Sequence, residues 1–190
     1  MKSAIFSAIT IFATLATALP AAGPNEAAAE NLVARNHIKQ VINTSAVVNI
    51  QEDNPDTPLG VNNKAVVGRT GGKHNSQALV KFDFPAGLRG SKCQLAFGYP
   101  EQFSGSKEIQ VLTVGDANIE TATYNRRPYR DQFKGTFRVL GWGEAVVVDG
   151  SGLTFDCPAK GAQAYEVVSV GDINEVIWYA PWDGLRIDVS

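Results

Sequence analysis

Cysteine and histidine are scarce in this sequence of 190 residues, and their scarcity argues against several kinds of site. The chain has two cysteines, Cys93 and Cys157, and two histidines, His37 and His74, which are too few for a typical zinc site. A nucleophilic triad would have to be built around His74, which lies in the polar, Gly-rich stretch GRTGGKHNSQ. We interpret that stretch as a solvated loop, and we predict no metal site, no cofactor and no catalytic triad.

Clusters of positive charge and long apolar runs are also lacking. The formal net charge is −2, and the only basic cluster is formed by Arg126, Arg127 and Arg130, so we expect no nucleic-acid partner. No stretch after the N-terminal region approaches the roughly 20 apolar residues that cross a bilayer as a helix. We therefore expect no membrane insertion of the mature chain.

The N-terminal residues have the pattern of a cleaved secretory signal. Lys2 provides a positive charge, residues 4–15 are short and mostly apolar, and Ala16-Thr17-Ala18 offers the small residues that precede cleavage. We predict a signal peptide over residues 1–18, a disordered spacer or pro-segment over 19–37, and one domain over 38–190. The expected location is secreted or extracellular, either free or in association with a cell wall.

Secretion changes how the two cysteines are interpreted, because disulfides persist in oxidising compartments. Two cysteines on this route predict one disulfide, between Cys93 and Cys157. The same route makes Asn43 a predicted glycosylation site, since Asn43-Thr44-Ser45 is the only N-x-S/T sequence in the chain.

From residue 38 onward the pattern predicts an all-β protein. In QALVKFDF, Ala78, Val80, Phe82 and Phe84 alternate with polar residues, which is typical of a half-buried strand. Similar short runs rich in Val, Ile, Phe, Tyr and Thr recur between glycine-containing turns. About ten short strands at this spacing favour an antiparallel β-sandwich or jelly roll. The longest connection without a strand pattern is Gly115–Gln132, and a loop of that length is often functional.

The C-terminal stretch VIWYAPWDGLRIDV contains two of the three tryptophans. The strand period places Trp178 on one face with Val176, and we predict that this face lies in the core. Further along, Leu185, Ile187 and Val189 are expected to point inward, with Arg186 and Asp188 facing solvent. Pro181–Gly184 is expected to form a tight hairpin turn. Trp182 sits at that turn, where it either folds back over the sheet or stands exposed as a platform for a sugar ring.

Carboxylates provide little support for an enzyme. A glycosidase needs two acids facing each other across a cleft, and the sequence does not single out such a pair. Asp83 and Glu166 alternate with apolar residues, as ordinary outward-facing residues do. Asp131 follows Arg127 and Arg130, so an ion pair that braces the long loop is expected there. We therefore favour a non-enzymatic protein, and a carboxylate-dependent glycoside hydrolase remains an alternative.

Several motifs resemble those of a known family. They are FDFP at residues 82–85, the following Cys93, YNRRPYRD at 124–131, CPAKG at 157–161 and GLRI at 184–187. Taken together and in this order, they resemble the But-two C-terminal domain family, mostly small secreted fungal proteins, over Gln40–Val189. The family takes its name from a member described as binding the activating enzyme of a ubiquitin-like modifier. The resemblance implies a β-sandwich with a disulfide between Cys93 and Cys157, and it implies no catalytic residues.

The element TYNRRP is also similar to a T-W-N-x-x-P element of secreted β-sandwich modules found beside cell-surface polysaccharide enzymes, with Tyr124 in place of the tryptophan. We therefore predict a secreted, non-enzymatic protein that binds a cell-wall polysaccharide, another glycan or an extracellular surface protein. The alternatives are the hydrolase and an adaptor that binds a ubiquitin-like-modifier activating enzyme. The predicted binding residues are Tyr124, Tyr129, Tyr179, Trp182 and Asp183.

Overall fold

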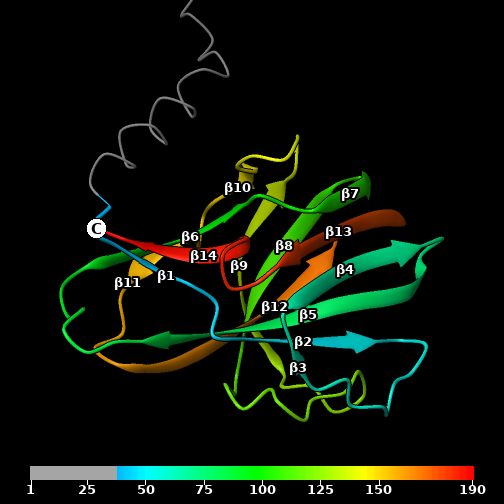
Figure 1. The fold of residues 1–190 in the computed structure, drawn as a ribbon, viewed down its shortest axis with the longest axis horizontal. Coiled ribbons are helices and arrows are strands. Elements are labelled where there is room, and N and C mark those ends of the chain that lie inside the picture. Colours follow the sequence, from blue (N-terminus) through cyan, green and yellow to red (C-terminus); the bar gives the residue numbers. More distant parts are fainter. Residues whose placement is uncertain (1–37) are drawn as a thin grey trace, which may run out of the picture. The chain divides into compact units, whose positions relative to one another are not determined.

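The computed structural model describes residues 38–190, and the regular structure in this range is entirely β, without a helix (Figure 1). The fourteen strands are β1 (Gln40–Ile42), β2 (Ala46–Gln51), β3 (Val61–Asn62), β4 (Lys64–Thr70), β5 (Lys73–Phe84), β6 (Lys92–Gly98), β7 (Gln102–Gly105), β8 (Glu108–Val114), β9 (Arg130–Arg138), β10 (Val146–Asp149), β11 (Thr154–Asp156), β12 (Gly161–Ser169), β13 (Ile173–Tyr179) and β14 (Gly184–Val189). The predicted all-β class is confirmed. The strands outnumber the roughly ten expected, because short strands such as β3 and β7 lie in stretches without clear alternation.

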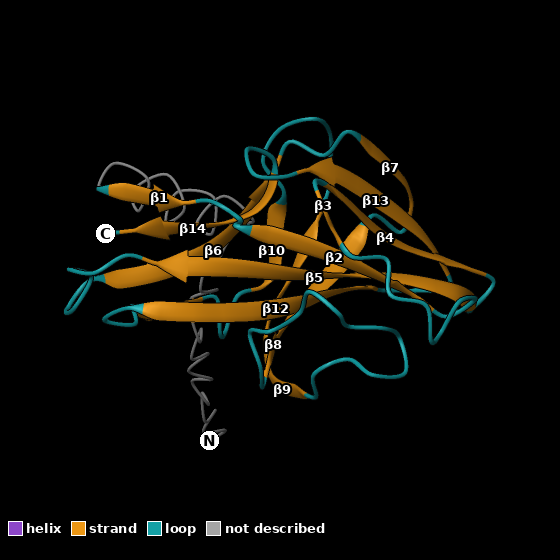
Figure 2. Ribbon diagram, turned by 60° about the horizontal axis from the view of Figure 1, so that its bottom comes forward, coloured by secondary structure: helices purple, strands orange, loops and turns teal. Residues whose placement is uncertain are grey.

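The strands form two antiparallel sheets. The smaller sheet has the order β1-β14-β6-β11. The larger sheet has the order β10-β9-β8-β12-β5-β4-β13-β7, and β2 joins it by pairing with β5 and β3. Strand β5 pairs with β12 in one of the two longest strand pairings of the larger sheet. The two strands run side by side in Figure 2. The antiparallel sheets and the apolar core that they share agree with the sandwich-type architecture predicted from the sequence.

Strand β5 shows how the sequence pattern produces the core. Its inward side chains are nearly or fully buried: Ala78, Val80, Phe82 and Phe84. Asp83 faces the other way and is exposed, as predicted. Apolar side chains from the smaller sheet, including Leu95, Phe97 and Ile187, belong to the same core cluster. Burial of this apolar surface is the main force that holds the domain together.

Trp178 lies at the centre of the core, as predicted. Its side chain is fully buried, and its ring meets Phe97 edge to face with 5.1 Å between the ring centroids. Gly184 packs directly against this ring, because a Cβ atom at Gly184 would lie 1.9 Å from Cδ1 of Trp178. Gly184 also has a φ of 81°, a backbone conformation that glycine adopts readily. Both the turn and the core therefore require glycine at this position.

The connection between β13 and β14 differs from the predicted hairpin. Strand β13 pairs with β4 and β7 in the larger sheet, whereas β14 pairs with β1 and β6 in the smaller sheet. The turn at Pro181–Gly184 therefore carries the chain from one sheet to the other. Leu185, Ile187 and Val189 point into the core as predicted.

Arg186 and Asp188 lie on the outward side of β14, but the prediction that they face solvent is wrong. Asp188 is buried and Arg186 is half-buried. Nε of Arg186 lies 3.0 Å from Oδ1 of Asp188, and Nη2 of Arg186 lies 3.0 Å from Oε1 of Glu144. The outward side of β14 is therefore partly covered, because Arg186 pairs there with Asp188 and Glu144.

The Gly-rich stretch around His74 is not a loop. It forms the β4–β5 hairpin, in which Gly71 and Gly72 make a tight turn with φ values of 60° and 75°. His74 is exposed at the start of β5, with Nδ1 2.8 Å from Oδ1 of Asp53. The prediction of a solvated side chain is correct for His74, and the prediction of a loop is wrong because paired glycines can close a hairpin.

The long connection from β8 to β9 covers part of the outer face of the larger sheet. Strand β9 already begins at Arg130, so the connection ends earlier than the predicted Gln132. The backbone N–H of Gly115 donates to the carbonyl of Tyr129 at 3.0 Å and closes the two ends of the loop. A second apolar cluster forms beneath the loop: Val48, Ile50, Leu79, Val114, Ile119, Ala122 and Ala164. A face that alternation alone would expose to water is therefore partly buried.

Cys93 and Cys157 form the predicted disulfide, with 5.1 Å between their Cα atoms. Cys93 lies in β6 and Cys157 follows β11, which is the neighbour of β6 in the smaller sheet. The bridge therefore ties two adjacent strands at one edge of that sheet.

The predicted signal peptide and spacer, residues 1–37, lie outside the described residues. Residues 38–190 contain no helix long and apolar enough to span a membrane.

Candidate functional site

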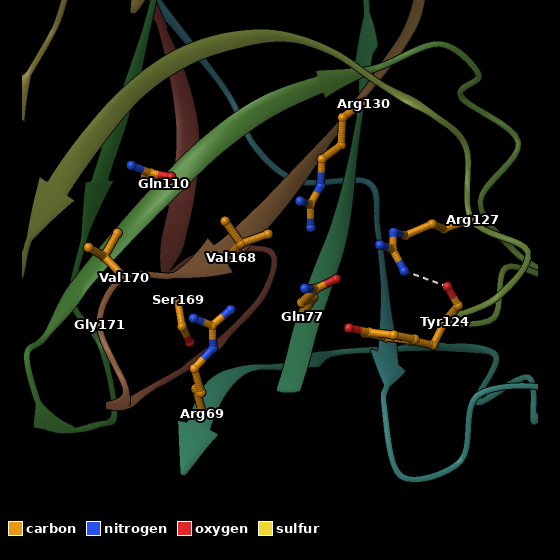
Figure 3. Close-up of a pocket in the computed structure, with 10 residues that line it drawn as sticks. All are labelled: Arg69, Gln77, Gln110, Tyr124, Arg127, Arg130, Val168, Ser169, Val170 and Gly171. Carbon is orange, nitrogen blue, oxygen red and sulfur yellow. Dashed lines mark hydrogen bonds between the residues drawn. The ribbon is translucent and has the colours of Figure 1, made fainter. Parts of the chain in front are cut away.

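A pocket of about 410 Å3 opens on the outer face of the larger sheet (Figure 3). Its walls come from β4, β5, β8, β12, the start of β9 and the loop before β9. The residues that line it are Arg69, Gln77, Gln110, Tyr124, Arg127, Arg130, Val168, Ser169, Val170 and Gly171. We call it the arginine pocket, after the three arginines among these residues. Most of the residues that line it are polar or charged.

Glu166 lies beneath the arginine pocket and fixes two of its arginines. It sits on the outer side of β12, yet it is fully buried. Arg130 approaches it at two points, with Nε–Oε2 at 2.5 Å and Nη2–Oε1 at 2.9 Å, and Nε of Arg127 lies 3.4 Å from Oε1. A buried carboxylate is costly unless it is paired and hydrogen-bonded, and here both conditions are met.

Gln77 completes this arrangement from β5. With its amide nitrogen toward Glu166, it donates to Oε1 at 2.6 Å, and its oxygen accepts from Nη2 of Arg130 at 3.3 Å. The hydrogen bonds to Glu166 also raise the pKa of the Arg130 guanidinium, so this group stays charged throughout the accessible pH range. In Figure 3, Gln77 lies between Arg130 and Arg127 on one side and Arg69 on the other.

Tyr124 and Arg127 form a second fixed unit within the long loop. The guanidinium of Arg127 lies over the ring of Tyr124, 4.6 Å from its centroid, and Nη1 donates to the carbonyl of Tyr124 at 2.5 Å. The loop that carries them is tied to the segment before β3, because the N–H of Asn125 donates to the carbonyl of Pro55 at 2.9 Å. These contacts hold one wall of the arginine pocket in place.

Arg69 enters from the opposite wall and is held by neutral groups. Its Nε donates to Oδ1 of Asn75 at 2.5 Å, and Nδ2 of Asn75 donates to Oε2 of Glu52 at 2.5 Å. The backbone N–H of Asn75 also donates to Glu52, and this hydrogen bond is the main cause that lowers the pKa of the Glu52 carboxyl. The hydrogen-bonded link from Glu52 to Arg69 runs through Asn75, and the charge of Arg69 adds a smaller contribution to the lowered pKa of Glu52.

The charges of the site are strongly unequal. The lining holds three arginines and no carboxylate, and Glu166 beneath them supplies one negative charge, which leaves a net charge of +2. The whole chain, in contrast, has a formal net charge of −2. Hydrogen bonds and ion pairs between described residues leave Nη1 of Arg130, Nη2 of Arg127 and both terminal nitrogens of Arg69 unused. The site is thus a concave cationic surface with free N–H donors.

The arginine pocket does not assemble catalytic groups of the kinds considered from the sequence. Its lining contains no histidine, cysteine or carboxylate, and the adjacent Glu166 is engaged by two arginines. Across residues 38–190 there is also no group of three or more His, Cys, Asp or Glu side chains arranged to hold a metal ion. The arrangement can bind and orient a polar ligand.

The predicted binding residues fall into separate places. Tyr124 lines the arginine pocket, whereas Tyr129 lies at the end of the loop against Gly115 and is largely exposed. Tyr179, Trp182 and Asp183 lie at the β13–β14 connection and do not line the pocket. Trp182 is 79% exposed, as a sugar platform requires. Its role in binding, like that of Tyr179 and Asp183, remains a prediction.

Two interpretations of charged residues need correction. Glu166 was expected to be an ordinary outward residue, but the loop and its arginines cover it completely. Asp131 was expected to brace the loop, but no ion pair between described residues involves it, and Arg127 and Arg130 pair with Glu166 instead. Asn43 lies half-buried between β1 and β2, and its glycosylation stays a prediction.

Sequence reasoning missed Arg69, Gln77, Gln110 and Ser169, which come from four different strands. The sequence does contain one usable signal, because the outward positions of β5 include the polar Gln77 and the apolar Leu79. The structure shows that Leu79 is fully buried. That combination indicates an outer face that is partly covered.

The comparison with known families identifies the chain, whereas no curated protein matches it. A sequence profile described as "Ubiquitin 3 binding protein But2 C-terminal domain" matches residues 45–180, which include most of the strands and both walls of the arginine pocket. Both cysteines of the disulfide also fall within this match. The chain therefore belongs to the Ubiquitin 3 binding protein But2 C-terminal domain family, as its motifs suggested.

Proposed function

We propose that this protein is a secreted, non-enzymatic binding module that recognises a glycan at a cell wall or in the extracellular medium, with the arginine pocket as its binding site. The observation that carries the proposal is the attachment of Arg127 and Arg130 to the buried Glu166. Their free donors are held in place before a ligand arrives, and such preorganisation reduces the entropy lost on binding.

The lining of the arginine pocket suits a ligand rich in hydroxyl groups. The side-chain amides of Gln77 and Gln110 accompany the guanidinium groups. The volume of about 410 Å3 falls in the range usual for small-ligand sites, roughly 300–1,000 Å3. Secretion supports an extracellular ligand, and it rests on the N-terminal sequence pattern.

The test is a polysaccharide and glycan array probed with the full chain from a secretory host, with a parallel assay for released sugars. We expect binding without product release. Gln110→Phe fills the arginine pocket without changing any charge and should abolish binding. Gln94→Phe makes the same change on β6, outside the pocket, and should leave binding intact. Product release would favour the hydrolase, and binding that survives Gln110→Phe would contradict the pocket as the site.

A second candidate function follows from the family description, which names a ubiquitin-binding protein. In this case the protein would be an adaptor for a ubiquitin-like pathway. The same preparation should be tested against a ubiquitin-like modifier and its activating enzyme by size-exclusion chromatography. Complex formation in the absence of glycan binding would favour the adaptor.

A further inference from the structure

We infer that the arginine pocket selects a negatively charged group, so that its ligand is an acidic sugar carrying a carboxylate or a sulfate. This inference rests on the proposed function and specifies the ligand class. The pocket carries an excess of positive charge that the protein itself does not neutralise. Three guanidinium groups line the pocket, and only Glu166 contacts any of them directly as a carboxylate. Even when Glu52 is counted, which reaches Arg69 through Asn75, one positive charge remains.

Arg69 is the most informative of the three arginines, because it does not pair with the buried carboxylate of Glu166. Arg127 and Arg130 are explained by the buried carboxylate that they pair with. Arg69 makes its bond to the neutral oxygen of Asn75 and leaves both terminal nitrogens free. Like charges gathered in one concavity repel each other, so a third arginine raises the free energy of the empty site. A bound anion would remove that cost.

The unused nitrogens are of the kind that recognises anions. Guanidinium groups present paired N–H donors whose spacing matches the two oxygens of a carboxylate or the oxygens of a sulfate. Arg130 and Arg127 approach from one side of Gln77 and Arg69 from the other (Figure 3). An acidic sugar residue that fills the pocket therefore faces guanidinium donors on both walls.

The decisive experiment compares one glycan backbone with and without its charge. The full chain is titrated with oligogalacturonate, with the same oligomer as its neutral methyl ester, and with a sulfated galactan oligomer. We expect the acidic or sulfated form to bind and the methyl ester to bind at least about tenfold more weakly, as expected for loss of a charge-assisted contact. Raising the salt concentration from about 50 mM to about 500 mM should weaken binding of the charged ligand.

Arg69→Gln removes one positive charge without leaving Glu166 unpaired, and it should weaken binding about tenfold or more. Arg69→Lys should retain part of the affinity. The matched control is Arg89→Gln, which makes the same charge change at an exposed position between β5 and β6 and should alter affinity less than about twofold. Equal melting temperatures of these variants confirm that folding is intact.

The outcomes separate the inference from the proposed function. If the methyl ester binds as well as the acid and Gln110→Phe blocks both, the pocket binds glycans but the inference of charge selection is overturned. If charged oligomers bind equally to wild type, Arg69→Gln and Gln110→Phe, the attraction is nonspecific and the inference is also overturned. If none of these oligomers binds while the array gives a neutral ligand, the inference fails alone. If the array gives no ligand either, both fail.

Discussion

Arg130 and Glu166 form a two-point ion pair in which the carboxylate is completely buried while the guanidinium side chain remains 39% exposed. The two residues lie on β9 and β12, which are separated by β8 in the larger sheet. The pair therefore crosses a strand on the outer face and anchors the start of β9 to the floor of the arginine pocket.

Substitution of Arg130 tests how much this ion pair contributes to the free energy of unfolding. Arg130→Met leaves the buried Glu166 with only Arg127 and Gln77, and we expect a loss of roughly 3 kcal/mol in the free energy of unfolding, measured by urea denaturation. The control Arg138→Met breaks the pair with the partly exposed Glu108 and should cost at most about 1 kcal/mol. The double variant Arg130→Met/Glu166→Leu removes both charges and should be more stable than Arg130→Met alone. A double variant less stable than the single one would contradict this account.

The disulfide should account for a large part of the stability of the domain. It links residues 64 positions apart, and the chain-entropy relation for a loop of that size gives about 4 kcal/mol. We expect the double variant Cys93→Ala/Cys157→Ala to lose about this amount in urea denaturation. Peptide mapping without reduction should recover a linked peptide containing both cysteines. Two free thiols in the secreted protein would be incompatible with the structure.

The two C-terminal tryptophans should behave in opposite ways. Trp178 is fully buried, so Trp178→Ala should cost roughly 3–5 kcal/mol in unfolding free energy. Trp182→Ala should change it by at most about 0.5 kcal/mol, because the side chain is 79% exposed. Acrylamide quenching of the folded protein should lose an accessible component in Trp182→Ala. A polysaccharide pull-down with the same variant tests separately whether Trp182 is a sugar platform.

Tyr165→Phe should stabilise the protein. The Tyr165 side chain is fully buried, and its hydroxyl has no hydrogen-bond partner among the described residues. Removing an unsatisfied buried hydroxyl while keeping the ring against Phe82 is expected to gain up to about 1 kcal/mol in thermal or urea unfolding. The same substitution at the exposed Tyr129 should leave stability unchanged. A clear loss of stability in Tyr165→Phe would show that the hydroxyl has a partner.

Glu52 should make stability fall in acid. Hydrogen bonds from the backbone and side chain of Asn75 lower its pKa below the ordinary value of 4.5. A group whose pKa is lowered by folding contributes stability above its unfolded pKa and loses it as the pH falls through the folded value. Between about pH 6 and about pH 3, Glu52→Gln should therefore show a smaller drop in urea midpoint than wild type. Glu101→Gln, at an exposed acid in the turn before β7, is the matched control. Identical slopes for Glu52→Gln and wild type would contradict the prediction.

Local sequence determined the features that depend on near neighbours. The alternation in β5 predicted which side chains enter the core, and the same period assigned Trp178 to it, because successive strand residues point to opposite faces. The secretory pattern with two cysteines predicted the bridge between Cys93 and Cys157. The ordered motifs predicted the family.

Tertiary structure alone decided what happens on the outer faces. Period-two alternation states that Glu166 and Asp188 point away from the core, but it does not state what covers them. Glu166 is buried by arginines 36 and 39 positions away, brought over it by the β8–β9 loop. The β13–β14 turn likewise joins different sheets, because pairing depends on which distant strand lies alongside. The arginine pocket exists because five strands and the β8–β9 loop converge, and this convergence depends on long-range pairing that no local pattern encodes.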